Sequence, residues 1–248
     1  MLPSFSAVIL DMDGLVLDTE AAYRFAWQCA AKAMGLEIDD AFCRGLSGCH
    51  GDEVERQLKE KVGSIEKMRE FHHLSADCWW RHVKKYGIKV KPGVSKLLET
   101  LRPQEVPFCL ATNSKAANAL DCLALAGLEN VFSMIVSRDD VERGKPSPDI
   151  YLKAANMLGV RSDQCIAVED SFTGIIAASW AGTFPVLIPD GGEPSKKSRL
   201  LAHLVLNSLE ELNEWIAGES RSFREGVDND NSRDLDFFDS RATSVNIV

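Results

Sequence analysis

Two aspartates one residue apart are the first residues of this chain whose types and spacing suggest chemistry. Asp11 and Asp13 stand in the run ILDMDG at residues 9–14, straight after a short apolar segment. At about 4 Å and an effective dielectric of about 20, two carboxylates repel each other by about 4 kcal/mol. A divalent cation relieves that repulsion, and hard oxygen ligands suit Mg²⁺. The alternative is a turn at Asp13-Gly14, with Asp11 capping a backbone amide.

Hydroxyl and amide side chains follow a second apolar segment. Thr112, Asn113 and Ser114 stand where that segment runs into a helical pattern. Free backbone N–H groups at the start of a helix bind phosphate readily, so these residues suit a phosphate site. Ser114 also suits simple N-capping of the helix, and both interpretations can hold together.

A lysine is fixed between glycine and proline in the run GKPSPD at residues 144–149. The two prolines stiffen the segment and start the next helix, which fixes the direction of Lys145. A lysine on a loop is usually solvated, but one held in this way suits a fixed point charge.

Glu169 and Asp170 end another apolar segment, in the run VEDS at residues 168–171. Taken alone, they could be the acidic first turn of a helix. Four acids at two segment ends, together with one lysine, are harder to explain as separate caps. Together they predict a metal site that faces a phosphate.

Short apolar segments alternate with helical patterns along most of the chain. This alternation predicts an α/β fold with a parallel sheet and helices on both faces. In such sheets ligands bind at the carboxyl edge of the strands, so polar residues distant in sequence meet there. The expected strands are 7–10, 108–112, 131–136, 165–168 and 184–188, and the expected helices between them are 116–126, 148–158 and 173–181.

Nearly 100 residues separate the first two expected strands, far more than a crossover needs. Residues 22–34, 51–61 and 64–86 carry helical spacing, so we expect a helical insertion domain at 20–85. Lys91-Pro92-Gly93 marks the return to the core, with a helix from about Val94. The expected domains are therefore a core of residues 1–19 and 86–218, the insertion, and a flexible tail of residues 219–248. The candidate core residues of the insertion are Trp27, Leu58, Phe71, Leu74 and Trp79.

The bulk composition excludes several classes of function. A net charge of -9 and a pI near 5.1 disfavour nucleic-acid binding, which needs a basic face. The chain carries neither a signal peptide nor a stretch of about 20 apolar residues, so we expect a cytoplasmic protein that does not enter membranes. Seven scattered cysteines without a C-x-x-C pair suggest reduced, buried thiols. No obvious exposed apolar helix is present, which favours a monomer.

The order of the four motifs DMDG, ATNS, GKPSPD and VEDS resembles that of the haloacid dehalogenase (HAD) superfamily. The insertion after the first motif resembles the helical cap of its β-phosphoglucomutase-like branch. The resemblance covers roughly residues 5–215. It implies a Rossmann-like core with an inserted cap, and a Mg²⁺-dependent enzyme. Because the dehalogenases of the superfamily lack the second aspartate of the first motif, Asp13 favours phosphoryl transfer.

The resemblance also implies a role for each motif residue. Asp11 is the expected nucleophile that forms an aspartyl-phosphate, and Asp13 is the expected general acid and base. Thr112 and Lys145 are expected to hold the phosphoryl oxygens. Asn113 and Ser114 are expected to bind the substrate. The expected Mg²⁺ ligands are Asp11, the main-chain carbonyl of Asp13, and Asp170. Glu169 is expected either as a further ligand or just outside the ligand shell.

Phosphate hydrolysis is favoured over the mutase reaction, in which a phosphoryl group moves within a sugar phosphate. Mutases that this chain resembles carry a histidine soon after the first motif and an arginine in the cap loop, and this chain lacks both. Here residues 21–24 read AAYR, and the loop position of the arginine holds Gly48 or Cys49. We expect residues 45–50 to read the substrate, through Gly45, Ser47 and Gly48, and Arg24 or Arg44 to help bind an anion. A phosphosugar mutase is the alternative, and a non-catalytic binding protein is disfavoured because no motif acid or lysine is missing. The expected substrate is a small phosphorylated metabolite, a sugar or sugar-acid phosphate.

Overall fold

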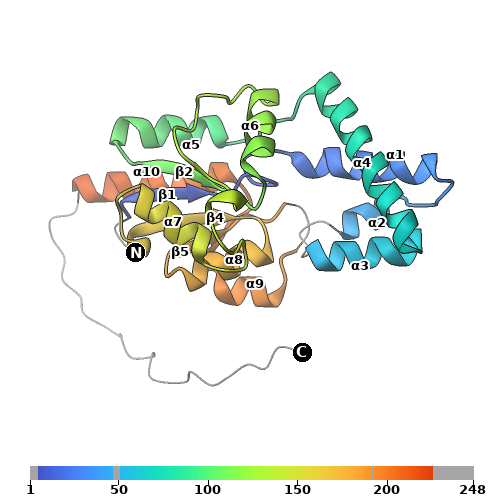
Figure 1. The fold of residues 1–248 in the computed structure, drawn as a ribbon. Helices are drawn as coiled ribbons and strands as arrows, with labels where there is room; N and C mark the ends of the chain where they lie inside the picture. The colour runs from blue at the N-terminus through green and yellow to red at the C-terminus, as the bar shows by residue number, and fades with distance from the viewer. Residues whose placement is uncertain (1–4, 47–50, 191–192, 226–248) are drawn as a thin grey trace, which may run out of the picture.

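A six-stranded parallel sheet forms the centre of the protein (Figure 1). The computed structural model describes residues 5–46, 51–190 and 193–225. The strand order is β3-β2-β1-β4-β5-β6, so β1 lies between β2 and β4. The strands are β1 (Ala7–Leu10), β2 (Phe108–Ala111), β3 (Ile135–Val136), β4 (Cys165–Glu169), β5 (Phe184–Leu187) and β6 (Leu204–Val205).

The predicted α/β fold is confirmed, with small differences at strand ends. The expected strand 131–136 shortens to two residues, Ile135 and Val136, at β3. The two-residue strand β6 was not predicted, since so short a strand carries no periodic pattern. All pairings are parallel, and Leu10 of β1 lies level with Leu110 of β2 and Val168 of β4.

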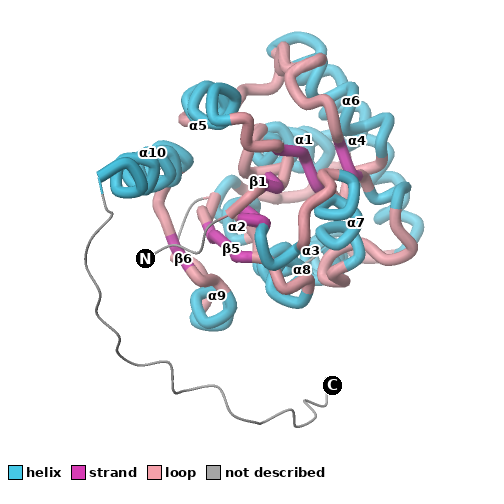
Figure 2. Tube along the Cα trace, turned by 90° about the vertical axis from the view of Figure 1, so that its left-hand side faces the viewer, coloured by secondary structure: helices cyan, strands magenta, loops and turns pink. Residues whose placement is uncertain are grey.

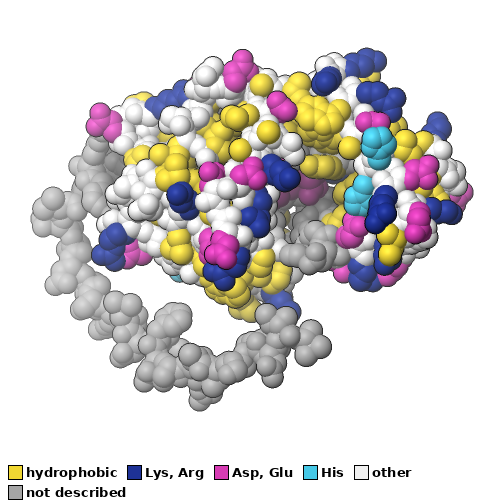
Figure 3. All heavy atoms as spheres, in the orientation of Figure 1, with side chains coloured by type: hydrophobic (Ala, Val, Ile, Leu, Met, Phe, Trp, Pro, Cys, Tyr) yellow, Lys and Arg dark blue, Asp and Glu magenta, His cyan; other side chains and the backbone are white. Residues whose placement is uncertain are grey.

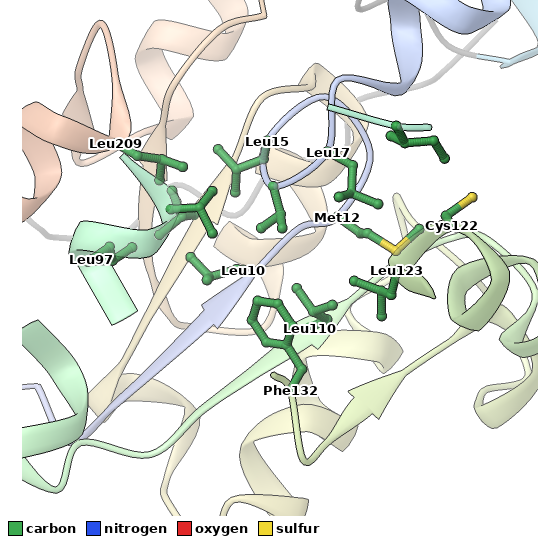
Figure 4. Close-up of a cluster of buried hydrophobic side chains, with 14 of the residues drawn as sticks. Leu10, Met12, Leu15, Leu17, Leu97, Leu110, Cys122, Leu123, Phe132 and Leu209 are labelled. Atoms are coloured by element: carbon green, nitrogen blue, oxygen red, sulfur yellow. The ribbon is translucent and has the colours of Figure 1, made fainter. Parts of the chain in front are cut away.

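Alternate residues of the strands pack against different helix layers. Val8 and Leu10 belong to one cluster of buried side chains, in which Figure 4 labels Leu10, on the face covered by α5 (Val94–Leu101), α6 (Ala116–Leu125) and α10 (Leu209–Glu225). Ala7 and Ile9 contribute to a second cluster, on the face covered by α7 (Asp149–Met157) and α8 (Phe172–Trp180). Figure 2 shows these helices on the two sides of the strands. The alternation follows from the two-residue period of a strand.

The core helices follow the predicted patterns closely, except that α9 and α10 were not predicted. Gly93 starts α5 with a positive φ of 86°, and an added Cβ there would lie 2.7 Å from the backbone nitrogen of Glu210. The return point therefore needs glycine. The core helices are α5 (Val94–Leu101), α6 (Ala116–Leu125), α7 (Asp149–Met157), α8 (Phe172–Trp180), α9 (Lys196–Leu201) and α10 (Leu209–Glu225), and three single 3₁₀ turns are Arg102–Gln104, Arg138–Asp140 and Ser162–Gln164.

Four helices form a separate layer beyond the carboxyl edge of the sheet (Figure 1). Leu58, Phe71 and Trp79 are buried as predicted, and Trp27 and Leu74 pack partly buried beside a cluster. Helix α2 was not predicted; Asp39 caps it by accepting a hydrogen bond of 2.7 Å from the Phe42 backbone N–H. The four helices are α1 (Thr19–Ala33), α2 (Asp40–Gly45), α3 (Gly51–Val62) and α4 (Ile65–Tyr86).

One pair of cysteines differs from the expectation of reduced thiols. Cys29 and Cys78 form a disulfide that joins α1 to α4, with their Cα atoms 6.3 Å apart. The prediction that every cysteine is reduced is therefore wrong for this pair. Linear spacing gave no sign of it, because the two residues meet only when the helices pack side by side. Cys43, Cys109, Cys122 and Cys165 are free and buried, as expected.

The C-terminal helix continues past the point where the sequence predicted a tail. The tail was predicted from residue 219, but α10 runs to Glu225. Leu212 and Ile216 are buried and anchor the helix, and its extension into a polar segment costs little once the helix exists. No helix in the described ranges has the length and apolar character that crossing a bilayer requires.

Candidate active site

Parallel register brings the polar residues of three strands to one edge of the sheet. Because Leu10 lies level with Leu110 and Val168, Asp11 lies beside the ends of β2 and β4. The Asp11 backbone N–H continues the pairing by donating to the Val168 carbonyl over 3.0 Å. A cavity of about 400 Å³ opens at this edge. Figure 3 shows the surface hollowed between the sheet domain and helices α1–α4.

Lys145 is the cationic centre of the site. Its ammonium donates to Asp11 Oδ1, to the Ala111 carbonyl over 2.8 Å and to Glu169 Oε1 over 2.5 Å. These bonds use all three donors of a lysine. Burial alone would lower the pKa of Lys145, but the adjacent carboxylates of Asp11 and Glu169 outweigh it and raise that pKa. Lys145 is therefore a permanent positive charge beside Asp11.

The backbone of Lys145 is fixed by Asn113. The Asn113 side chain accepts from the Lys145 N–H over 2.8 Å and donates to the Lys145 carbonyl over 3.1 Å. Gly144 allows this approach, since an added Cβ there would lie 2.5 Å from Asn113 Oδ1. The Lys145–Pro146 peptide bond is cis. Asn113 thus positions the lysine loop.

Asp13 is held by two hydroxyl groups. Thr112 Oγ1 donates to Asp13 Oδ2 over 3.1 Å, and Ser114 Oγ donates to the same oxygen over 2.9 Å. The Ser114 backbone N–H donates in turn to Thr112 Oγ1 over 3.0 Å. In the described ranges both of these hydroxyl bonds to Asp13 use Oδ2, and neither uses Oδ1.

Glu169 is completely buried, and its two oxygens are taken up by neighbours. Oε1 accepts from Lys145 and from the Tyr151 hydroxyl over 2.5 Å, and Oε2 accepts from Ser171 Oγ over 3.1 Å. Gly174 packs directly against this carboxylate, because an added Cβ would lie 1.9–2.0 Å from its three terminal atoms. Glu169 therefore anchors Lys145.

Gly174→Ala is expected to destabilise the protein by about 1–3 kcal/mol, as overpacking of a filled interior does. The added methyl group displaces Glu169, which frees Lys145, so any turnover falls together with stability. Denaturant unfolding and steady-state kinetics measure the two effects. Gly218→Ala is the matched control, because nothing lies within 4 Å of its added Cβ. Equal stability of both variants would contradict the packing described.

Three carboxylates form a cluster whose charge the chain itself does not balance. Oxygens of Asp11, Glu169 and Asp170 lie within 4.8 Å of one another, and in the described residues Lys145 is a cation bonded to two of them, Asp11 and Glu169. Burial, opposed by Lys145, raises the pKa of Asp11 to about 8. Burial also raises the pKa of Asp170 well above its usual range, with Asp11 adding to the effect. Such a cluster of hard oxygen donors fits a divalent cation.

Asp170 reaches the cluster because Gly14 leaves room for it. Gly14 has a positive φ of 84°, and an added Cβ would lie 2.1 Å from Asp170 Oδ2. The glycine of the first motif is therefore required by conformation and by contact.

Comparison with known proteins decides the family. The profile described as haloacid dehalogenase-like hydrolase matches residues 8–188. The chain belongs to the haloacid dehalogenase-like hydrolases. Within them it is a phosphatase-type hydrolase of the β-phosphoglucomutase and sugar-phosphatase branch.

Individual relatives agree with this placement in the HAD family. The chain is 32% identical over 179 residues to a phosphorylated carbohydrates phosphatase of Thermotoga maritima, covering 71% of this chain and 81% of that protein. It is 31% identical over 191 residues to a β-phosphoglucomutase of Bacillus subtilis, covering 75% and 84%. A crystal structure of an HAD family hydrolase from Deinococcus radiodurans, with bound phosphate and sodium, superposes with a TM-score of 0.71 at 28% identity, covering 88% and 97%.

The structure gathers most of the residues that the sequence proposed for this HAD site. Glu169 lies behind the cavity rather than on its wall, and exposed Gly45 is not part of the lining, whereas its neighbour Leu46 is. Ser47 and Gly48 lie outside the described residues. The proposed residues that line the cavity are Asp11, Asp13, Thr112, Asn113, Ser114, Lys145 and Asp170.

The structure also distinguishes the two candidate arginines. Arg24 lines the cavity and lies 3.7 Å from Glu20. Arg44 pairs with Asp40 over 2.7 Å, its side chain is 67% exposed, and it is not part of the lining. Of these two arginines, Arg24 is therefore the one that lies at the cavity.

Several lining residues were missed by the sequence reasoning. Thr19, Glu20, Tyr23 and Trp27 of α1 face the cavity together with Arg24. Their spacing of three or four residues marks one face of a helix that follows directly after the first motif. That signal could have found them. Tyr151, which bonds to Glu169, carried no such signal.

Proposed function

We propose that this protein is a Mg²⁺-dependent phosphatase that hydrolyses a small phosphorylated sugar or sugar acid through an aspartyl-phosphate. The observation that carries the proposal is the bond from the Lys145 ammonium to Asp11, beside an Asp13 that two hydroxyls hold. A nucleophile, a proton carrier and a fixed cation thus share one cavity. These are the parts that phosphoryl transfer by a carboxylate needs.

In the first step Asp11 Oδ attacks phosphorus, and the bond from phosphorus to the substrate oxygen breaks. Asp13 gives its proton to the leaving alkoxide. Thr112 and Lys145 each exchange one of their present hydrogen bonds, to Asp13 and to Asp11 respectively, for a bond to a phosphoryl oxygen. The charge of the transition state is then spread over positioned donors. Asn113 positions Lys145 for this role.

In the second step Asp13 removes a proton from water as that water attacks phosphorus. The bond between phosphorus and Asp11 breaks, inorganic phosphate forms, and both aspartates regain their starting states. The same group therefore acts as acid and then as base.

Mg²⁺ would be held by Asp11, Asp170 and the main-chain carbonyl of Asp13, with Glu169 just outside the ligand shell because its oxygens are already bonded. When bound, it supplies positive charge to the phosphoryl oxygens. The raised pKa values of Asp11 and Asp170 support the assignment, since a cation stabilises both ionised forms.

Adding Mg²⁺ to chelator-treated protein is expected to raise the melting temperature by about 5–10 °C at a hundredfold excess over Kd. Asp170→Asn should remove most of this rise, and should not destabilise the metal-free protein because it deletes one charge from a cluster of three carboxylates. Asp121→Asn, at an exposed position of α6, is the matched control that keeps the rise. Differential scanning calorimetry reports the shift without any turnover. An undiminished rise in Asp170→Asn would contradict the assignment.

We also propose that residues 20–85 act as a cap over a core of residues 1–19 and 86–218. Leu46 and Val54 from this segment line the same cavity as the core residues. Closure over a bound substrate would exclude bulk water and bring Arg24 to the part beyond the phosphate.

Phosphate release from a panel of small phosphate esters tests the function. The panel contains hexose, pentose, polyol and sugar-acid phosphates, each with Mg²⁺ and with chelator. We expect metal-dependent release from at least one member. The absence of release across the panel would overturn the phosphatase, and interconversion of sugar phosphates with a bisphosphate primer would then indicate a mutase.

A further inference from the structure

A second cavity of about 270 Å³ adjoins the reaction site. It lies between α1, α3 and α4 on one side and α6 on the other. Asp13, Tyr23, Trp27 and Ser114 line both cavities, so the two spaces share a wall. A substrate whose phosphate lies at Asp11 would therefore extend its remaining part toward this second space.

The walls of the second cavity are mostly aromatic. Three of the five tryptophans of the chain line it: Trp27, Trp79 and Trp80. Tyr23 lies in the same wall, stacked on Trp79 with ring centroids 5.8 Å apart, yet its side chain remains 43% exposed. An exposed ring facing a hollow offers a surface on which a planar group can stack.

Two polar groups of this cavity lack partners. Within the part of the chain that the structure describes, Ser75 Oγ and Trp79 Nε1 are buried without a hydrogen bond, and both residues line the cavity. Each residue is only 9% exposed, so bulk water does not compensate them. An indole N–H only donates, whereas a hydroxyl donates and accepts. Both atoms are covered in this structure, so a ligand edge that carries an acceptor and a donor would satisfy them once the Ser75 and Trp79 side chains turn toward the cavity.

The charges separate this cavity from the phosphate site. Among its lining residues that the structure describes, none is lysine or arginine, whereas one, Asp13, is a carboxylic acid. The adjoining reaction cavity holds Lys145 and Arg24. A second anionic group is therefore a poor occupant here, and a neutral ring with polar edges is a better one. The volume lies close to the lower end of small-molecule pockets, about 300 Å³.

We propose that this cavity binds a planar heterocycle, and that the phosphorylated sugar hydrolysed here is one that carries a base, a nucleoside 5′-monophosphate. The inference rests on the proposed function, because it places the phosphate at Asp11. The sugar spans the shared wall at Tyr23 and Trp27, and the base stacks among the aromatic rings with its polar edge at Ser75 and Trp79. Stacking of one base is strong enough to change selectivity by about 10- to 100-fold.

Ribose 5-phosphate and the monophosphates of uridine, cytidine, adenosine and guanosine are the matched substrates, since they differ at the base. We expect kcat/KM to be about 10- to 100-fold higher for at least one monophosphate than for ribose 5-phosphate. If ribose 5-phosphate is hydrolysed as well as every monophosphate, the inference is overturned while the phosphatase stands. If no ester in either panel is hydrolysed, the proposed function fails.

Substitutions in the second cavity test whether its residues cause the preference for a nucleoside monophosphate over ribose 5-phosphate. Trp79→Phe keeps a ring and removes the N–H donor, and Ser75→Ala removes the hydroxyl. Each should reduce the ratio of kcat/KM between the preferred monophosphate and ribose 5-phosphate several-fold, mainly through KM. Trp180→Phe, at an exposed position of α8, is the matched control and should keep the ratio. An unchanged ratio in both cavity variants would place the base elsewhere.

Nucleoside binding can be read without turnover. At least one of the four nucleosides uridine, cytidine, adenosine and guanosine should change the tryptophan fluorescence of the wild-type protein in a saturable way, whereas ribose should not. Ser75→Ala, which keeps every tryptophan, should weaken that binding. Absence of a saturable change with any of the four nucleosides would overturn the inference even for an active phosphatase, and binding in an inactive protein would support the cavity alone.

Discussion

Asp11→Asn is expected to abolish phosphate release, by roughly 10⁴-fold or more in kcat. The amide keeps the shape of the side chain but is no nucleophile, so no phosphoryl-enzyme forms. The fold should survive, because the substitution removes a carboxylate whose ionised form is already disfavoured. Burial raises the pKa of the Asp11 carboxyl group to about 8. Steady-state phosphate release and thermal unfolding measure the two quantities.

Asp13→Asn is the informative comparison for that result. It removes proton transfer and leaves the nucleophile, so we expect a loss of about 10²- to 10⁴-fold with a phosphoryl-enzyme still able to form from a good leaving group. Residual turnover in Asp11→Asn equal to that of Asp13→Asn would show that Asp11 is not the attacking group.

Lys145→Met should have the largest structural effect of any single substitution in the site. It leaves Asp11 and Glu169 buried without their cation, and breaking a buried ion pair in this way costs about 3–5 kcal/mol. Phosphate release should be lost as well, because the fixed charge at the phosphoryl group disappears. Denaturant unfolding gives the stability, and phosphate release from the best panel substrate gives the activity.

A double variant separates the two consequences. In Lys145→Met/Glu169→Gln one of the two stranded charges is removed, so stability should recover in part while activity stays absent. Lys96→Met, at an exposed position of α5, is the surface control and should change neither quantity. If Lys145→Met and Lys96→Met have the same free energy of unfolding, the three hydrogen bonds of Lys145 do not stabilise the protein as described.

Much of the site could be predicted from the sequence because its residues follow strands. A buried parallel strand is a short apolar run, and the polar residue after it must stand at the carboxyl edge. Asp11, Thr112 and Glu169 were therefore placed correctly at that edge without any knowledge of strand order. The order itself, with β1 between β2 and β4, depends on long-range packing and left no local signal.

Other features depend on tertiary contacts that no local pattern carries. The disulfide between Cys29 and Cys78 requires α1 to lie against α4, and the bond from Tyr151 to Glu169 requires α7 to pack beneath the sheet edge. The role of Glu169 also needed the structure. Its motif allowed a metal ligand or a residue outside the ligand shell, and its three hydrogen bonds favour the second.

The measurement that tests the account most directly is a rapid acid quench during turnover, followed by mass spectrometry of the peptide that contains Asp11. We expect one phosphoryl group on that peptide in the wild-type protein with Mg²⁺ and substrate, and none in Asp11→Asn or with chelator. Turnover of the same substrate without any phosphorylated Asp11, under quench conditions that preserve an acyl phosphate, would contradict the account.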